Sequence, residues 1–222
     1  MAVASPMNAI AAEAPSRAGV LPLVGSELAF DFTNTSSGRG GPRHMDHLRT
    51  PEHLLSWARH AKLLTPRDGR YIEKRLAADA ALGAALLERA LALREAIYAI
   101  GIACARGRRP RPEHVDALAH VHAGCIDKAR LSPCEANFAW VWRPEDGIIE
   151  AILGPIALSA LTTLSQADLT RIKQCGGEHC GWLFFDTTKN KRRRWCEMEV
   201  CGNRAKQKAH RARALRARGR GR

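Results

Sequence analysis

Two cysteine pairs in the last quarter of this 222-residue chain constrain its folding most. Cys175 and Cys180 form the first pair, Cys196 and Cys201 the second; four residues lie within each pair and fifteen between the pairs. Zinc takes four thiolate or imidazole ligands in a tetrahedron, which two short cysteine turns on a folded-back chain can supply. Two residues within a pair would be the commoner spacing, but glycines beside both pairs allow tight turns. The sequence predicts one structural zinc held by all four cysteines.

Other roles for these cysteines are less favoured. Disulfides fit the spacing, but no export signal precedes the pairs and thiols in the cytosol stay reduced. Unligated buried thiols would need less polar surroundings. His179 is a candidate substitute ligand, yet it adjoins Cys180, and one short turn cannot easily aim both at one metal. Four protein ligands leave no open coordination position, so we expect a structural rather than a catalytic zinc.

The positive charge of the chain is concentrated around these cysteines. Residues 189–222 contain 14 Lys or Arg and only two acids, a balance of +12. The other 188 residues hold 21 basic and 20 acidic side chains, a balance of +1. Such a concentration favours binding to a phosphate backbone, ahead of an anionic membrane or an acidic protein.

Several short motifs resemble a known family. WLFFD begins at position 182, TKNKRRRWC at 188, CGNR at 201 and AKQKAHRAR at 205. Over residues 171–213 the chain resembles the CGNR zinc finger, which in a bacterial protein family follows an ABATE domain described as a stress-induced transcription regulator. The resemblance implies a DNA-binding finger.

The finger offers two groups of candidate nucleic-acid contacts. A basic loop lies between the cysteine pairs, and a helix is expected directly after Cys201, an arrangement like that of a treble clef. In that helix Asn203 and Arg204 are candidates to read base edges, with the other cations on phosphates; cap and scaffold contacts for the second cysteine pair are almost equally favoured for these two residues. The candidate contacts are Lys189, Asn190, Lys191, Arg192, Arg193, Arg194, Asn203, Arg204, Lys206, Lys208 and Arg211.

We divide the chain into a disordered segment 1–24, an ABATE-like domain 25–168, the finger 171–213 and a disordered basic tail 214–222. Residues 28–35 (LAFDFTNT) alternate in polarity, which predicts a strand, and resemble the opening strand of the ABATE domain. Asp31, Asn34 and Thr35 are candidates to line a small-molecule pocket. Local side-chain bonds that cap the strand and hold the next loop, expected over residues 36–44, are the preferred interpretation.

Helices are predicted after this loop. Thr50 and Thr65 each precede a proline, which is a strong signal for a helix start. Apolar residues then recur at helical spacing. The expected helices are 51–64, 66–82, 84–105 and 112–126.

The periodicity then changes. Residues 137–142 and 147–153 read as the two strands of a hairpin around the turn 143–147, with 28–35 as a third strand, and 155–164 as a helix. The predicted fold class is therefore α+β, a mostly helical N-terminal domain with a small antiparallel sheet, followed by a treble-clef-like zinc finger and basic helix. Three further cysteines, Cys104, Cys125 and Cys134, are expected to be buried apolar thiols.

No phosphate loop, nucleophile elbow or paired catalytic carboxylates mark an enzyme. No apolar run reaches the ~18 residues of a membrane span, so we expect a cytoplasmic, nucleoid-associated protein. The predicted function is a zinc-finger DNA-binding transcriptional regulator, whose N-terminal domain senses a small-molecule effector or forms a homodimer. An RNA-binding, ribosome-associated protein is the alternative, and an enzyme with its site in the N-terminal domain comes third.

Overall fold

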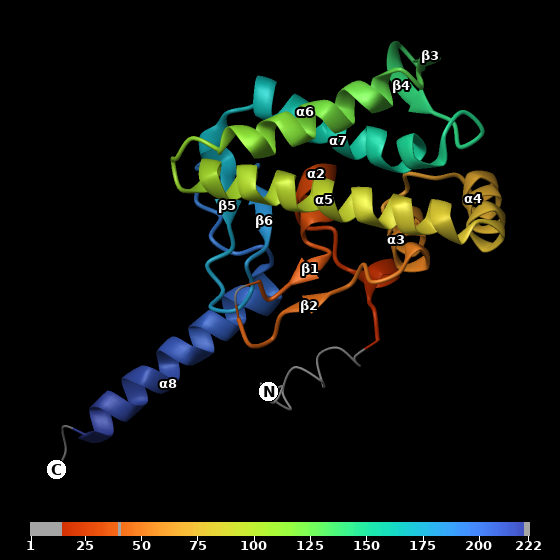
Figure 1. Cartoon of the computed structure of the whole chain (residues 1–222). Coiled ribbons are helices and arrows are strands. Elements are labelled where there is room, and N and C mark those ends of the chain that lie inside the picture. Colours follow the sequence, from red (N-terminus) through yellow and green to blue (C-terminus); the bar gives the residue numbers. More distant parts are fainter. Residues whose placement is uncertain (1–14, 40, 220–222) are drawn as a thin grey trace.

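The computed structural model describes residues 15–39 and 41–219, with side chains described to Arg213. Helices dominate this part of the chain, and the C-terminal one, α8, projects away from the rest (Figure 1). The helices are α2 (Leu28–Thr33), α3 (Pro51–His60), α4 (Pro66–Ala78), α5 (Ala80–Ala105), α6 (Pro112–Ile126), α7 (Ile148–Gln166) and α8 (Asn203–Gly219), with the short turns η1 (Ala18–Val20), η2 (Leu169–Arg171) and η3 (Met198–Gly202).

The described strands form three separate antiparallel pairs. They are β1 (Ser36–Ser37) with β2 (Met45–Asp46), β3 (Ala129–Cys134) with β4 (Asn137–Trp142), and β5 (Ile172–Gln174) with β6 (Leu183–Phe185). This arrangement confirms the predicted α+β class, although the sheet is divided into pairs rather than continuous.

The main core lies along α5, which contacts α2, α3, α6 and α7. Trp57 of α3 and Phe32 of α2 are both fully buried, and their ring centroids lie 5.0 Å apart. α7 is the one described helix long and apolar enough to cross a membrane by length and composition, with a mean hydropathy of 1.7. Half of that helix is buried inside the protein, against α2 and α6, so it serves as a core helix here.

The predicted helix starts are confirmed. The Thr50 side chain accepts a hydrogen bond from the His53 N–H, and Thr65 forms a capping box with Asp68. The boundary expected at Gly83 is wrong, because the chain breaks at Asp79 instead, whose carboxylate caps α5 through the Leu82 N–H. α3 also ends earlier than predicted, at His60.

The strand predicted over residues 28–35 is wrong, because this segment forms helix α2. Residues two apart share one face of a strand but point about 200° apart on a helix. Phe32 accordingly joins the main core, whereas Phe30 joins a second cluster with Ile172 and Leu183. Burial on two sides therefore decides in favour of the helix, which local alternation cannot reveal.

The hairpin predicted from residues 137–153 is also wrong in part. β4 is a strand and residues 143–147 form the turn, as predicted. However, β4 pairs with β3, which precedes it in the sequence, and residues 148–153 begin α7. Ile148, Ile149 and Ile152 favour a strand by local propensity, and proline within a helix, here Pro155, is unusual. The loop expected over 36–44 contains the two residues of β1.

Parts of the segments expected to be disordered are folded. Residues 15–24 include η1, and Ala18 and Leu21 are buried; residues 1–14 and 220–222 lie outside the described part. α8 continues to Gly219. Of the three remaining thiols, Cys125 is buried and Cys104 half-buried, whereas Cys134 is exposed at the end of β3, contrary to expectation.

The finger is docked directly on the helical domain through β6. The Asn34 side-chain amide donates to the Leu183 carbonyl and its oxygen accepts the Leu183 N–H, each at 2.9 Å. The Phe185 N–H donates to the Gly25 carbonyl at 2.8 Å, and the Tyr98 hydroxyl to the Gly181 carbonyl at 3.1 Å. The two parts thus share a continuous interface.

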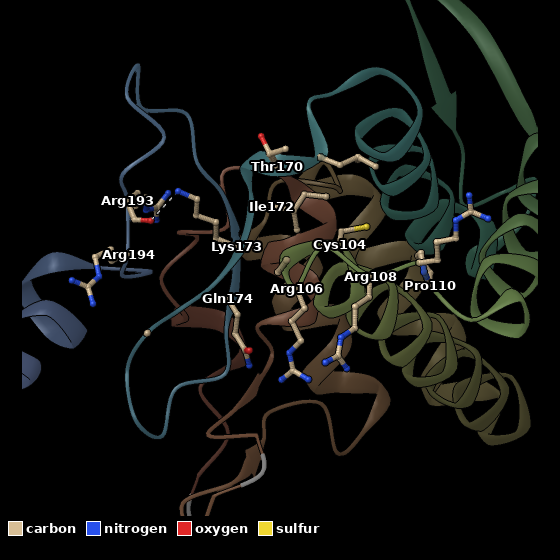
Figure 2. A pocket seen from close by; sticks show the side chains of 15 residues that line it. Cys104, Arg106, Arg108, Pro110, Thr170, Ile172, Lys173, Gln174, Arg193 and Arg194 are labelled. Carbon is tan, nitrogen blue, oxygen red and sulfur yellow. Dashed lines mark hydrogen bonds between the residues drawn. The ribbon is translucent and has the colours of Figure 1, made fainter.

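A groove of about 850 Å³ runs along this interface, between the C-terminal end of α5 and strand β5 (Figure 2). We call it the junction groove. Cys104, Ala105 and Ile172 contribute apolar surface, and arginines from the α5–α6 loop and the finger line it as well.

Candidate metal centre and nucleic-acid interface

The β5–β6 hairpin places the first cysteine pair. Cys175 directly follows β5, and Cys180 lies in the connection to β6; the Cys175 N–H donates to the Trp182 carbonyl at 2.8 Å and closes the turn. Cys196 follows the basic loop, and Cys201 lies in the π-helical turn η3 that leads into α8. A hairpin turn and a helix start thus supply two sulfurs each.

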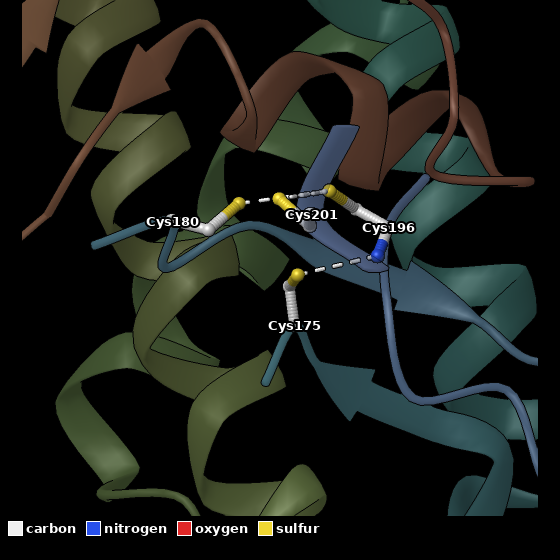
Figure 3. Close-up of side chains that lie close together, drawn as sticks. All are labelled: Cys175, Cys180, Cys196 and Cys201. Atoms are coloured by element: carbon white, nitrogen blue, oxygen red, sulfur yellow. Dashed lines mark hydrogen bonds between the residues drawn. The ribbon is translucent and has the colours of Figure 1, made fainter. Parts of the chain in front are cut away.

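The four sulfurs converge on one point (Figure 3). All lie within 4.8 Å of one another, and Cys196 Sγ is 3.6 Å from the Sγ atoms of both Cys180 and Cys201. A tetrahedron with Zn–S bonds of about 2.3 Å has edges of about 3.8 Å, so the spacing fits zinc. Backbone N–H groups of Cys196 and Gly177 donate to Cys175 Sγ at 3.2 and 3.4 Å, as suits a thiolate.

The charge of four thiolates at this spacing also calls for a cation. Hydrogen bonds from the other three thiols, that of Cys180 first, hold the pKa of the Cys175 thiol well below its usual range. The corresponding contacts, that with Cys175 first, raise the pKa of Cys196. Neighbouring thiolates repel one another, so four of them require a compensating cation, and a divalent metal supplies it.

The comparisons with known protein families agree with this geometry. Residues 171–214 match the model of the CGNR zinc finger. Residues 26–167 match the ABATE model, described as "Putative stress-induced transcription regulator". This chain belongs to the ABATE family. None of the curated proteins compared with it matches.

The CGNR finger of this ABATE protein holds one structural zinc on Cys175, Cys180, Cys196 and Cys201. His179, the candidate substitute, is outside the set; its Nδ1 lies near Gly41. Around the ligands, Phe184 is fully buried and Trp182 and Trp195 are partly buried, so that these aromatic rings and the cysteines form a miniature core. Such a core is too small to fold without the metal.

Asp186, the last residue of WLFFD, organises the basic loop and was missed as a site residue. Its solvent-shielded carboxylate accepts hydrogen bonds from the Lys173 ammonium at 2.6 Å, the Thr188 N–H at 3.0 Å and the Arg193 N–H at 2.9 Å. Burial acts to raise the pKa of Asp186, but these hydrogen bonds, that of Lys173 first, hold it well below its usual range. Its position as a single acid next to a basic segment is the sequence feature that could have identified it.

The structure separates the predicted nucleic-acid contacts into two classes. Most are exposed, namely Lys189, Asn190, Arg192, Arg194, Asn203, Arg204, Lys206 and Arg211. Three are engaged with protein groups, namely Lys191, Arg193 and Lys208.

Arg193 is the most fully engaged of these. Its guanidinium donates to the carbonyls of Val24, Trp195 and Cys196 at 2.6 to 3.1 Å and to the Ser26 hydroxyl at 3.0 Å. It also lies 4.3 Å from the centroid of the Phe184 ring. Arg193 therefore fastens the second cysteine pair to the N-terminal segment.

Lys191 and Lys208 are engaged more loosely. The ammonium of Lys191 pairs with Asp168. Lys208 of α8 contacts both oxygens of Glu178 at 2.5 and 2.6 Å. Both pairs are exposed, and such pairs contribute little to stability.

The three residues predicted for a ligand pocket or local bonds make hydrogen bonds to the protein. The Asp31 carboxylate accepts the Gly25 N–H at 2.7 Å, and the Thr35 hydroxyl donates to the Phe32 carbonyl at 2.7 Å. Asn34 binds across the interface to Leu183 instead. Asp31 and Thr35 thus make local hydrogen bonds, as preferred from the sequence. The long-range bonds of Asn34 could not be predicted from the sequence.

Burial next to this interface affects Asp31. It raises the pKa of the Asp31 carboxyl to about 6, against the lowering effect of the hydrogen bond from Gly25. Asp46 behaves differently: burial acts to raise its pKa, but the bidentate contact with the buried Arg94 guanidinium, at 2.5 and 2.8 Å, outweighs burial and lowers it.

Proposed function

We propose that this ABATE protein is a zinc-dependent, DNA-binding transcriptional regulator. The observation that carries the proposal is the position of α8: the zinc ligand Cys201 lies two residues before the helix, which projects into solvent and carries cations on its exposed surface (Figure 1). An α-helix fits the major groove of B-DNA. At 17 residues, α8 is about 25 Å long, long enough to reach base edges and phosphates together.

Asn203 and Arg204 are the proposed base-reading residues, because they begin α8 and both are exposed. Among the described residues, neither side chain makes a hydrogen bond or an ion pair, which favours a binding role over a scaffold role. Lys206, Arg211 and the exposed loop cations Lys189, Arg192 and Arg194 are proposed phosphate contacts. Asn190 lies beside them.

The proposal assigns no catalytic residue. Four protein ligands close the coordination sphere of the zinc, so it has no position for a substrate or an activated water. We place the protein in the cytoplasm, associated with the nucleoid, as its DNA partner requires.

Selection from a random duplex DNA library by the zinc-loaded protein tests this function. A defined motif that Cys201→Ser loses would support a sequence-specific, zinc-dependent regulator. Preference for a parallel RNA pool, without an enriched DNA motif, would refute DNA regulation and favour the ribosome-associated alternative.

Two neighbouring substitutions then separate the roles on α8. Arg204→Ala should relax base preference at one position of the motif by about 1–3 kcal/mol. Lys206→Ala should weaken all sequences alike and reduce the salt slope by about one. Equal, uniform effects of both substitutions would exclude base reading by Arg204.

We also propose that the N-terminal domain forms a homodimer, with sensing of a small-molecule effector as the alternative role. A single finger forms a small interface with DNA, and dimerisation would double it. One face of the β3–β4 hairpin exposes Leu131, Phe138 and Trp140. Light scattering should give a dimer mass for the parent and a monomer mass for the double variant Phe138→Ser, Trp140→Ser; a parent monomer would refute this part.

A further inference from the structure

The junction groove has an unbalanced charge. Its described lining contains six cationic side chains and no carboxylate. Three come from the loop after α5 and three from the finger: Arg106, Arg108, Arg109, Lys173, Arg193 and Arg194. The groove is therefore positive on both walls, although the N-terminal domain as a whole is nearly neutral.

Two of these six cations are already neutralised or saturated by the protein. Lys173 has three N–H donors, and its ammonium contacts Asp186 at 2.6 Å and the carbonyls of Lys191 and Arg193. The guanidinium of Arg193 makes the four hydrogen bonds described above. These two residues build the wall of the groove rather than bind a ligand.

The other four cations are exposed: Arg106, Arg108 and Arg109 on one side and Arg194 on the other. Figure 2 shows the ends of the Arg106, Arg108 and Gln174 side chains directed to the same side. Arg194 also lines a second hollow of about 510 Å³ together with Arg192. The cationic surface thus continues from the helical domain to the basic loop of the finger.

The backbone of the α5–α6 loop holds these arginines in place. Gly107, with a φ of 63°, donates its N–H to the Cys104 carbonyl at 2.9 Å, and the Arg108 N–H donates to the Ala103 carbonyl at 2.8 Å. Cations at a helix C-terminus also complement the helix dipole, but that effect fades beyond the last turn. It accounts for neither Arg109 nor Arg194, which belongs to the finger.

We propose that the junction groove binds the sugar–phosphate backbone of the nucleic acid held by the finger, so that the ABATE domain itself contributes phosphate contacts. This inference rests on the proposed nucleic-acid binding. Backbone contacts require cations for phosphate and tolerate apolar surface against sugar, which the arginines and the Cys104–Ala105–Ile172 surface provide. The contacts fix the orientation of the duplex relative to the helical domain, and they carry no sequence information.

The test compares two triple variants of the full, zinc-loaded chain on a fluorescein-labelled 30-base-pair duplex. The groove variant is Arg106→Gln, Arg108→Gln, Arg109→Gln. The control is Arg67→Gln, Arg70→Gln, Lys74→Gln, which removes the same charge from exposed positions on α4, at the far end of the helical domain from the finger (Figure 1). Zinc content and thermal unfolding of both variants establish that each is folded.

The groove variant should bind roughly 10- to 100-fold more weakly near 100 mM salt, and the slope of log K against log salt should decrease in magnitude by about two to three. The control should change affinity less than about threefold, with nearly the parent slope. Equal effects of the two variants would overturn the inference while leaving the finger's function intact. A parent that binds neither duplex DNA nor RNA would refute the proposed function itself.

Discussion

Replacing Asn34 by alanine should weaken the attachment of the finger to the helical domain. Asn34 and Leu183 are 2 % and 0 % exposed, and the two hydrogen bonds between them are 2.9 Å long. The Asn34 amide satisfies both backbone groups of Leu183, on the side of β6 away from β5. Asn34→Ala leaves this N–H and C=O without partners in a buried place.

Each of the two orphaned backbone groups costs about 1–3 kcal/mol, so the free energy of unfolding should fall by about 2–6 kcal/mol. For a chain of this size, this corresponds to a Tm lower by roughly 4–24 °C. Guanidinium unfolding followed by tryptophan fluorescence measures the first quantity. Zinc transfer to a chelating dye should also accelerate, because β6, which carries Phe184 of the miniature core, is held less firmly against the helical domain.

Asn137→Ala is the matched control, since Asn137 is exposed in the β3–β4 hairpin. Asn34→Asp sets a carboxylate oxygen against the Leu183 carbonyl and should destabilise the protein at pH 7, with recovery on acidification. If Asn34→Ala unfolds within about 0.5 kcal/mol of Asn137→Ala, the interface does not depend on this amide, and the reasoning fails.

Three further predictions concern the finger and the partly buried Asp31. Arg193→Ala should lower the free energy of unfolding by about 2–4 kcal/mol. Arg192→Ala should leave stability unchanged and reduce the salt slope of DNA binding by about one. Identical behaviour of the two variants would contradict the assignment of Arg193 to contacts within the protein and of Arg192 to DNA. Chelation of zinc should increase the solvent exposure of Trp182 and Trp195. Most of the helical signal in far-UV circular dichroism should remain, because the helices of the main core lie outside the cysteine cluster. Loss of the whole helical signal would contradict this prediction and show that the finger supports the entire fold. The folded-state pKa of Asp31, about 6, lies above its ordinary value of 3.8, so the stability that its protonated form provides is complete below pH ~4 and is lost as the pH rises through 6. Asp31→Asn should therefore be more stable than the parent by roughly 1–3 kcal/mol at pH 7.5 and equal to it near pH 4, and an equal difference at both pH values in chemical denaturation would argue against this titration.

The sequence by itself determined the zinc site and the helix starts. Four cysteines at fixed spacing identify their own ligand set, because the metal demands a tetrahedron of donors whatever the rest of the chain does. Thr50 and Thr65 before prolines predict helix starts for a similarly local reason, since capping involves groups only three residues apart. The residues from Cys201 onward likewise predicted a helix after the second cysteine pair and its positive charge.

Only the tertiary structure decided the state of short apolar segments. Residues 28–35 and 147–153 fit a strand by alternation or β-branching, but both are buried on more than one side and form helices α2 and α7. β3, with Pro133 and little apolar alternation, gave no local signal and is held by its pairing with β4. Propensity is weak compared with the burial that distant elements impose.

Tertiary structure also decided which cations are available to bind a ligand. Arg192 and Arg193 are equivalent in the sequence, yet one is exposed and the other donates to three carbonyls and a hydroxyl. Arg106, Arg108 and Arg109 belong to a nearly neutral domain and gain a common surface with Arg194 only through the docking of β5 beside α5. A charge count records how many cations a segment has, whereas the fold determines which of them remain unneutralised and which lie together.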